Sequence, residues 1–111
     1  MKNYIQDGDT LDLAAPYAVS SGGGALVGAT FGVAVTDLAS GAVGAFATEG
    51  VYTLPKATGA STGGNQGALA YWDNTNKNIT AASSNNTKIG VFALTCANAD
   101  TTARVRLNGA F

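Results

Sequence analysis

Short runs of alternating hydrophobic and polar residues recur along the chain, and clusters of turn-forming residues separate them. Leu11 and Leu13 alternate with polar neighbours, which predicts an early strand. Pro16 and the serine- and glycine-rich run 20–24 predict the loop that follows. Because a period of two is typical of half-buried strands and helical spacing is nearly absent, we expect a chain built from strands.

The clearest alternation begins at Val27 and ends near Thr36. Its odd positions carry the larger apolar side chains, which predicts a single strand with one face in the core. Gly28 and Gly32 lie at even positions, so the opposite face is nearly smooth and a second backbone or subunit can approach it closely.

A second long strand is predicted over 43–54, with a β-bulge at 49–50. Pro55 and Lys56 should end it. The polar, glycine-rich stretch 57–67 is then expected to be a loop, and loops of that length often carry function.

The last third of the chain predicts a hairpin and two further strands. Residues 69–72 and 78–80 flank a turn at 73–77. Residues 89–94 are apolar at most positions, which predicts a strand buried on both sides. In the final strand, 104–107, arginine alternates with Val105 and Leu107, so one of its faces should be exposed to solvent.

Many short strands separated by turns are typical of an all-β sandwich or barrel with little or no helix. We see no repeat, linker or second domain and expect one domain over 1–111, in which 1–9 is either an N-terminal arm or the first strand. The side chains expected to form the core are Val27, Phe31, Val33, Phe46, Leu54, Ile89, Val91, Phe92, Val105 and Leu107.

The composition indicates a small core and a weakly charged surface. Leu, Ile, Val and Phe supply 23 of the 111 residues, close to the level of about 20% below which chains tend to be disordered. Only 12% of residues are charged and the net charge is −1, whereas soluble domains average about 25% charged residues. Such a surface suits contact with other proteins and lacks the basic cluster that nucleic-acid binding needs.

No apolar run reaches the roughly 18 residues of a membrane span. The opening residues 1–7 lack the apolar centre of a signal peptide. We therefore expect a protein that is made and kept in the cytoplasm, or assembled there, and that does not bind membranes.

The residues that usually carry catalysis are scarce. The chain has no histidine and a single cysteine, Cys96, which excludes an imidazole base, a thiolate metal site and an internal disulfide. Cys96 near a strand end could be a nucleophile, but a buried small residue is the commoner role of a free cysteine. No cofactor and no enzymatic activity are expected.

Two further motifs have ordinary structural explanations. Asp7, Asp9 and Asp12 resemble the start of a calcium loop but lack the remaining ligands, so a turn before a strand is the simpler interpretation. The glycines at 22–24 precede neither a lysine nor a helix, which argues against a phosphate-binding loop and hence against an ATPase.

Four residues are candidate partner contacts. Tyr4 and Ile5 lie in a segment that could add a strand to a partner's sheet edge or be the first strand of this protein's own sheet. Arg104 and Arg106 share one strand face and could pair with an acidic partner surface or simply be solvated. Trp72 could be an interface anchor, although a place in the core is the expected one.

Four stretches, in order, resemble a family of small phage capsid cement (head decoration) proteins, which are often mislabelled as RecA/RadA-type recombinases. They are MKNYIQDGDT at 1–10, VGATFGVAV at 27–35, TEGVYTLPK at 48–56, and the pair of YWD at 71–73 with TTARVRL at 101–107. The chain departs from many relatives at 65–68, where they have a Gly-Asp pair, so the role of the 57–67 loop stays open.

The resemblance implies a compact β-barrel or β-tulip-like sandwich, homotrimers on the outer capsid surface and no catalytic residues. The expected function is therefore a virion structural protein that binds the major capsid protein and stabilises contacts between its neighbours. The alternatives are another phage binding module, such as a tail or baseplate component or a carbohydrate-binding domain, and an enzyme. An exposed aromatic platform would favour the binding module, with Tyr17, Tyr52, Tyr71 and Trp72 as its candidates.

Overall fold

The computed structural model describes residues 10–108, and this part of the chain contains nine strands and no helix. The all-β prediction is confirmed. The strands are β1 (Thr10–Ala14), β2 (Gly24–Val27), β3 (Thr30–Ala34), β4 (Val43–Ala47), β5 (Glu49–Pro55), β6 (Leu69–Asp73), β7 (Asn78–Thr80), β8 (Thr87–Phe92) and β9 (Thr102–Asn108). Within the same range, no helix is available that could span a membrane.

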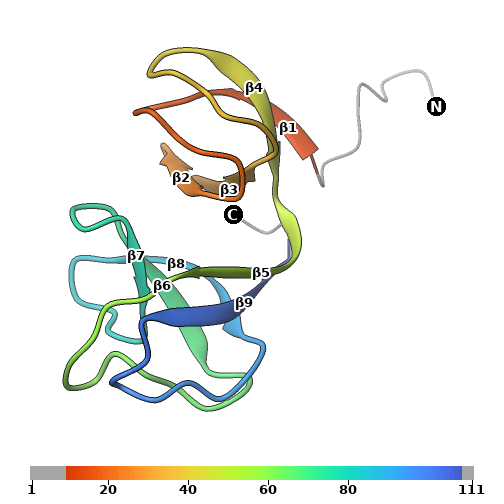
Figure 1. Cartoon of the computed structure of the whole chain (residues 1–111). Coiled ribbons are helices and arrows are strands. Elements are labelled where there is room, and N and C mark those ends of the chain that lie inside the picture. Colours follow the sequence, from red (N-terminus) through yellow and green to blue (C-terminus); the bar gives the residue numbers. More distant parts are fainter. Residues whose placement is uncertain (1–9, 109–111) are drawn as a thin grey trace.

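The strands form two antiparallel sheets arranged as two layers (Figure 1). The N-terminal sheet has the order β1-β4-β3-β2, and the C-terminal sheet has the order β5-β9-β8-β6-β7. The C-terminal sheet curls so that its edge strands β5 and β7 touch at one end, where Lys56 and Ile79 form an isolated parallel bridge and the Ala57 N–H donates to the Ile79 carbonyl at 2.8 Å. The result is a half-barrel with a smaller open sheet above it, consistent with the predicted barrel-like sandwich.

The segment 27–35 forms a hairpin, so the prediction of one continuous strand is wrong. Val27 ends β2 and pairs with Thr30 at the start of β3, which leaves Gly28 and Ala29 as a two-residue turn. Gly28 has a φ of 62°, and a two-residue turn with its first residue at positive φ favours glycine there. The alternation continues on both sides of the turn while the chain reverses direction, and Val27 is consequently only half-buried.

The predicted long strand 43–54 is divided between the two sheets. β4 pairs with β1 and β3, whereas β5 pairs with β9, and the buried Thr48 lies between β4 and β5. Figure 1 shows the two strands as one bent ribbon that joins the layers. Strands that pass from one sheet to another bend at such corners. The predicted bulge at 49–50 is instead the start of β5.

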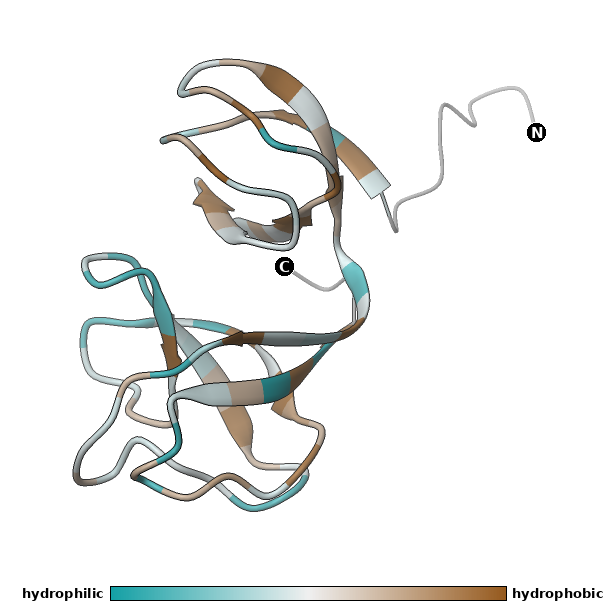
Figure 2. Cartoon of the chain, in the orientation of Figure 1, coloured by the Kyte–Doolittle hydropathy of each residue, from teal (hydrophilic) through white to brown (hydrophobic). Residues whose placement is uncertain are grey.

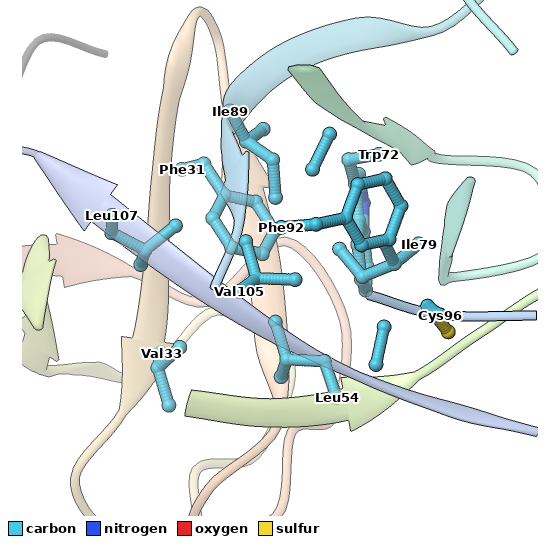
Figure 3. Close-up of a cluster of buried hydrophobic side chains, with 12 residues drawn as sticks. Phe31, Val33, Leu54, Trp72, Ile79, Ile89, Phe92, Cys96, Val105 and Leu107 are labelled. Carbon is cyan, nitrogen blue, oxygen red and sulfur yellow. The ribbon is translucent and has the colours of Figure 1, made fainter. Parts of the chain in front are cut away.

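The main hydrophobic core lies inside the half-barrel and is completed by the N-terminal sheet. Phe31 and Val33 from β3 pack into it, and the rings of Phe31 and Trp72 lie 4.9 Å apart at 53° (Figure 3). Trp72 is buried, as expected. The other buried members of this main core are Leu54, Ala70, Ile79, Ile89, Phe92, Cys96, Ala103, Val105 and Leu107. Figure 2 shows the complementary pattern, with hydrophilic residues concentrated in turns such as 73–77.

Eight of the ten predicted core residues are buried, and the two exceptions are half-buried. Val27 is less buried than predicted because it ends the first strand of a hairpin, and Val91 is less buried because it lies on the exposed face of β8. The prediction that 89–94 is buried on both sides is therefore wrong, since β8 ends at Phe92 and Leu94 is 51% exposed.

Gly90 permits the close packing of β8 against β9. A β-carbon at this position would lie 2.1 Å from the Arg106 carbonyl oxygen. The pairing of β8 with β6 also shifts here, between Ala70 and Tyr71, which places Ile89 and Gly90 both on the buried side.

A second, smaller cluster lies on the other face of the N-terminal sheet. Phe46 is its largest member, and Ala15, Val19, Ala25 and Ala34 are buried with it. The backbone bridge between Val19 and Leu38 holds the covering loops together. This cluster gives the N-terminal sheet a core of its own, but one made largely of alanine, which buries little area per residue.

Lys56 is a buried lysine that ties two loops together. Its side chain is 5% exposed, and its ammonium group donates to the carbonyls of Ala57, Asn98 and Asp100 and to the Thr62 hydroxyl. A buried ammonium must be surrounded by acceptors, and here they come from both the 57–67 loop and the 96–101 loop. The lysine that ends β5 therefore closes one end of the half-barrel.

Replacing Phe31 with alanine is expected to destabilise the protein by about 3–5 kcal/mol, because it leaves a cavity where the two sheets meet. Urea denaturation measures the loss. The exposed Leu94 provides a control, since Leu94→Ala should change stability by less than about 0.5 kcal/mol. A loss below about 1 kcal/mol for Phe31→Ala would place Phe31 outside the core.

Replacing Lys56 with methionine keeps the length of the side chain but leaves its oxygen acceptors without a donor. We expect a loss of about 2–4 kcal/mol in the same measurement. Arg106→Met, at an exposed position on β9, is the control and should cost less than about 1 kcal/mol. Equal effects of the two substitutions would show that the Lys56 hydrogen bonds are not needed to close the half-barrel.

Candidate binding surface

The outer face of β9 carries the two arginines that the sequence singles out. Ala103, Val105 and Leu107 point into the core, so Arg104 and Arg106 lie on the opposite, exposed face. The predicted one-sided exposure of this strand is confirmed. The role of the two arginines as partner contacts stays a prediction.

Apolar side chains flank Arg106 on both sides across the sheet. The strand register places it between Val51 of β5 and Val91 of β8, and Val91 is in turn opposite Leu69 of β6. Val51 is 54% exposed and Leu69 is 48% exposed. Residues paired in this way share one face of a sheet, so they form a continuous apolar row interrupted by a single guanidinium group.

Arg104 occupies the next position along the same face. It is paired with Thr53 of β5 and lies near the exposed Leu94. Together, Val51, Thr53, Leu69, Val91, Leu94, Arg104 and Arg106 are called the β9 face below.

Neither guanidinium group of the β9 face forms a hydrogen bond or an ion pair with any residue in 10–108. No carboxylate in the described part of the chain pairs with either guanidinium group. Arginine is suited to pairing with a carboxylate because its planar donors match the two oxygens of that group. The face combines exposed aliphatic area with positive charge that has no partner within 10–108, a composition that suits contact with another protein.

A hollow of about 300 Å³ opens beside Arg104, between β5 and the 94–102 loop. Leu94 and Thr53 line it together with Asp100, and Cys96 lies on its buried side. The Asp100 carboxylate accepts a hydrogen bond from the Ala97 N–H at 2.9 Å, so it is occupied in shaping the loop.

Cys96 is a free cysteine that is buried in the main core. Burial raises the pKa of its thiol, the neighbouring Asp100 carboxylate raises that pKa further, and the Lys56 ammonium opposes the shift. The thiolate is the reactive form of cysteine, so this environment suppresses reactivity. No imidazole exists in the chain to activate the thiol, and the sulfur instead lies 3.5 Å from the Thr102 carbonyl.

The structure does not bring the other residues singled out by the sequence together into a site within 10–108. Tyr4, Ile5, Asp7 and Asp9 lie outside the described residues. Within 10–108, no three side chains of the His, Cys, Asp and Glu types lie together in a way that could hold a metal ion. Gly22 and Gly23 belong to a tight turn, in which the Gly23 N–H donates to the Ser20 carbonyl at 2.8 Å, and Gly24 begins β2.

The aromatic residues do not form an exposed platform in the described part of the chain. Trp72 is 1% exposed and donates its indole N–H to Asn74. The three tyrosines are half-buried. Tyr17 and Tyr52 donate their hydroxyl groups to the Gly24 and Glu49 carbonyls. The feature that would favour carbohydrate binding is thus missing from this region.

The 57–67 loop is held against the 92–101 segment instead of projecting from the protein. Gly64 and Cys96 exchange backbone hydrogen bonds at 2.8 and 3.0 Å, and the Gly59 N–H donates to the Asn98 carbonyl. A β-carbon on Gly63 would lie 2.4 Å from the Cys96 carbonyl oxygen. These contacts give the loop a structural role, which the sequence left open.

Sequence reasoning found the arginines of this face but missed its apolar part. The sequence pattern places Val51 and Leu69 in strands but does not say which way their side chains face. The signal lies in the alternation along each strand: since Leu54 and Ala70 point into the core, the odd-numbered residues beside them must point outward. Only the register shows that Val51 and Leu69 lie in the same row as Arg106.

A family model described as phage cement protein matches residues 5–107 of the chain. This range includes β1 to β8 in full and nearly all of β9. No curated protein and no solved structure matches the chain.

Alkylation of Cys96 by iodoacetamide near neutral pH is expected to be at least about tenfold slower in the folded protein than in the denatured chain. The raised pKa means that the rate should increase as the pH rises above the ordinary thiol range, because the thiolate forms only there. Ala97→Cys in a Cys96→Ser background places a thiol on an exposed neighbour and should react quickly. Equal rates for folded and denatured Cys96 would contradict its buried, protonated state.

Proposed function

Because the chain belongs to the phage cement protein family, and is thus a capsid-associated structural protein, we propose that it binds the outer surface of a phage capsid and stabilises contacts between neighbouring major capsid proteins. The observation that carries this proposal is the match of the family model over 5–107. Synthesis in the host cytoplasm and later addition to the shell are part of the same proposal.

The surface of the protein supports a binding role. The β9 face offers exposed aliphatic side chains and unpaired arginines, and the chain as a whole carries few charges that would have to be desolvated on contact. Small clamps of this kind act together, because each copy contributes modestly and many copies are present on one shell.

We further propose that the protein acts as a homotrimer, or as a monomer that trimerises on the shell. A small core leaves a modest margin of stability, which burial between subunits increases. Cyclic assembly is the usual way in which identical subunits close an interface. Tyr4 and Ile5 are the proposed capsid contacts of the N-terminal segment, and Arg104 and Arg106 are proposed to meet an acidic partner surface.

The function is tested with expanded and unexpanded shells of the phage that encodes the chain. The purified protein should co-sediment with expanded shells and raise the temperature at which they disrupt. Unexpanded shells provide the control, because the proposed site exists only after neighbouring capsid proteins have moved into their final positions. Absence of binding to either form would refute the proposal.

Deleting residues 1–6 separates the two explanations of the N-terminal segment. If the segment is an arm that adds a strand to the capsid protein, the truncated protein keeps its melting temperature and loses shell binding. If the segment is the first strand of the protein's own sheet, the truncated protein melts at a lower temperature in isolation. Unchanged melting together with unchanged binding would remove Tyr4 and Ile5 from the contact.

A further inference from the structure

Charge is divided unequally between the two sheets. In 10–47 the charged residues are Asp12 and Asp37 alone. In 48–108 five cationic residues outnumber three carboxylates, which gives a net charge of +2 (5 − 3). The N-terminal sheet is therefore acidic and the C-terminal sheet is basic, although the whole chain has a net charge of only −1.

The exposed large hydrophobic side chains of the described residues fall into two groups. Val51, Leu69 and Leu94 belong to the β9 face, and Val35 and Val43 belong to the N-terminal sheet, where they are 52% and 68% exposed. Exposed aliphatic side chains that gather on a sheet mark a contact surface more often than scattered ones do.

Val35 and Val43 share one face of the N-terminal sheet with Asp12. Asp12 is paired with Ala45, and the Val35 N–H donates to the Ala45 carbonyl, so these three residues form one row across the sheet. Val43 lies two residues before Ala45 and is paired with Ala14, which places both on the same face. Asp12, Ala14, Val35, Val43 and Ala45 are called the β4 face below.

Both faces carry exposed aliphatic side chains, but the β4 face is negatively charged and the β9 face is positively charged. Asp12 makes no hydrogen bond or ion pair with another described residue, whereas the Asp37 carboxylate accepts a hydrogen bond from the Ser21 N–H at 2.7 Å. Within 10–108, Asp12 is thus a carboxylate without a partner among valines and alanines. Arg104 and Arg106 are cations without a partner in the same range, among valine and leucine side chains. An acidic apolar face and a basic apolar face on one molecule are complementary surfaces.

We propose that the β4 face of one copy packs against the β9 face of the next, with Asp12 placed against Arg104 and Arg106 and the valines of both faces in contact. The acidic partner surface of the two arginines is then a second copy of this chain. The proposal rests on the proposed function only in that copies are expected to meet on a shell. Because the two faces differ, the contact is head-to-tail, and such contacts close into rings when the rotation between copies allows it.

Charge reversal on each face tests the pairing. Sedimentation over a range of concentrations measures association of the full chain in solution, at low and at high salt. The wild-type protein should associate with increasing concentration, and more weakly at high salt. Asp12→Arg alone, and Arg104→Asp with Arg106→Asp, should each weaken association by at least about tenfold, because like charges then face each other.

Two further arrangements separate a specific contact from a folding defect. The chain that carries all three substitutions has its charges exchanged and should regain association. An equimolar mixture of the Asp12→Arg and the double-arginine variants should also associate, because each face of one variant then meets an opposite charge on the other. Ser84→Arg and Ser84→Asp, in the exposed 83–86 loop, are matched controls and should associate like the wild type.

A wild-type protein that stays monomeric at all concentrations in solution and also on shells overturns the proposal, as does a triple variant that folds but does not regain association. Shell binding is measured on the same proteins. If the double-arginine variant loses shell binding while its self-association is unchanged, the β9 face meets the capsid and the proposal is wrong. If the wild type fails to bind shells but the charge exchange restores association, the proposed function fails and the contact between copies stands.

Discussion

The packing of β3 into the half-barrel is the interaction on which the rest of the structure depends. Phe31 and Val33 enter from the N-terminal sheet, and the ring of Phe31 meets Trp72 at the centre of the core (Figure 3). Without this contact, the N-terminal sheet would bury only a small cluster around Phe46. Two buried polar residues flank β5. Thr48 lies where the chain passes from one sheet to the other, and Lys56 closes one end of the half-barrel.

The same core fixes the candidate binding surface. Val105 and Leu107 hold β9 in register, and a slip by one residue would bury the arginines and expose the valine and leucine. The positions of Arg104 and Arg106 are therefore as well defined as the core itself. The exposed valines and unpaired charges do not add to the stability of a single copy, which agrees with a capsid-associated protein whose surfaces act between molecules.

Several features could be predicted from the sequence because they depend on local chemistry. The alternation in 102–107 gives both the strand and its exposed arginines, the turn residues at 73–77 give the β6–β7 hairpin, and the lack of histidine excludes an imidazole base. The 27–35 segment could not be predicted in the same way. Its period of two is unchanged across Gly28, so the pattern does not reveal that the chain reverses there.

The sequence by itself determined that this is an all-β protein, which residues fill most of its core and which family it resembles, because these follow from periodicity, composition and motif order. Apart from the β6–β7 hairpin, the tertiary structure alone decided which strands are neighbours. Pairing joins residues far apart in the chain, such as Val51 with Arg106 and Asp12 with Ala45. The two apolar, oppositely charged faces exist only through that pairing, because strand register places side chains of distant segments in a single row.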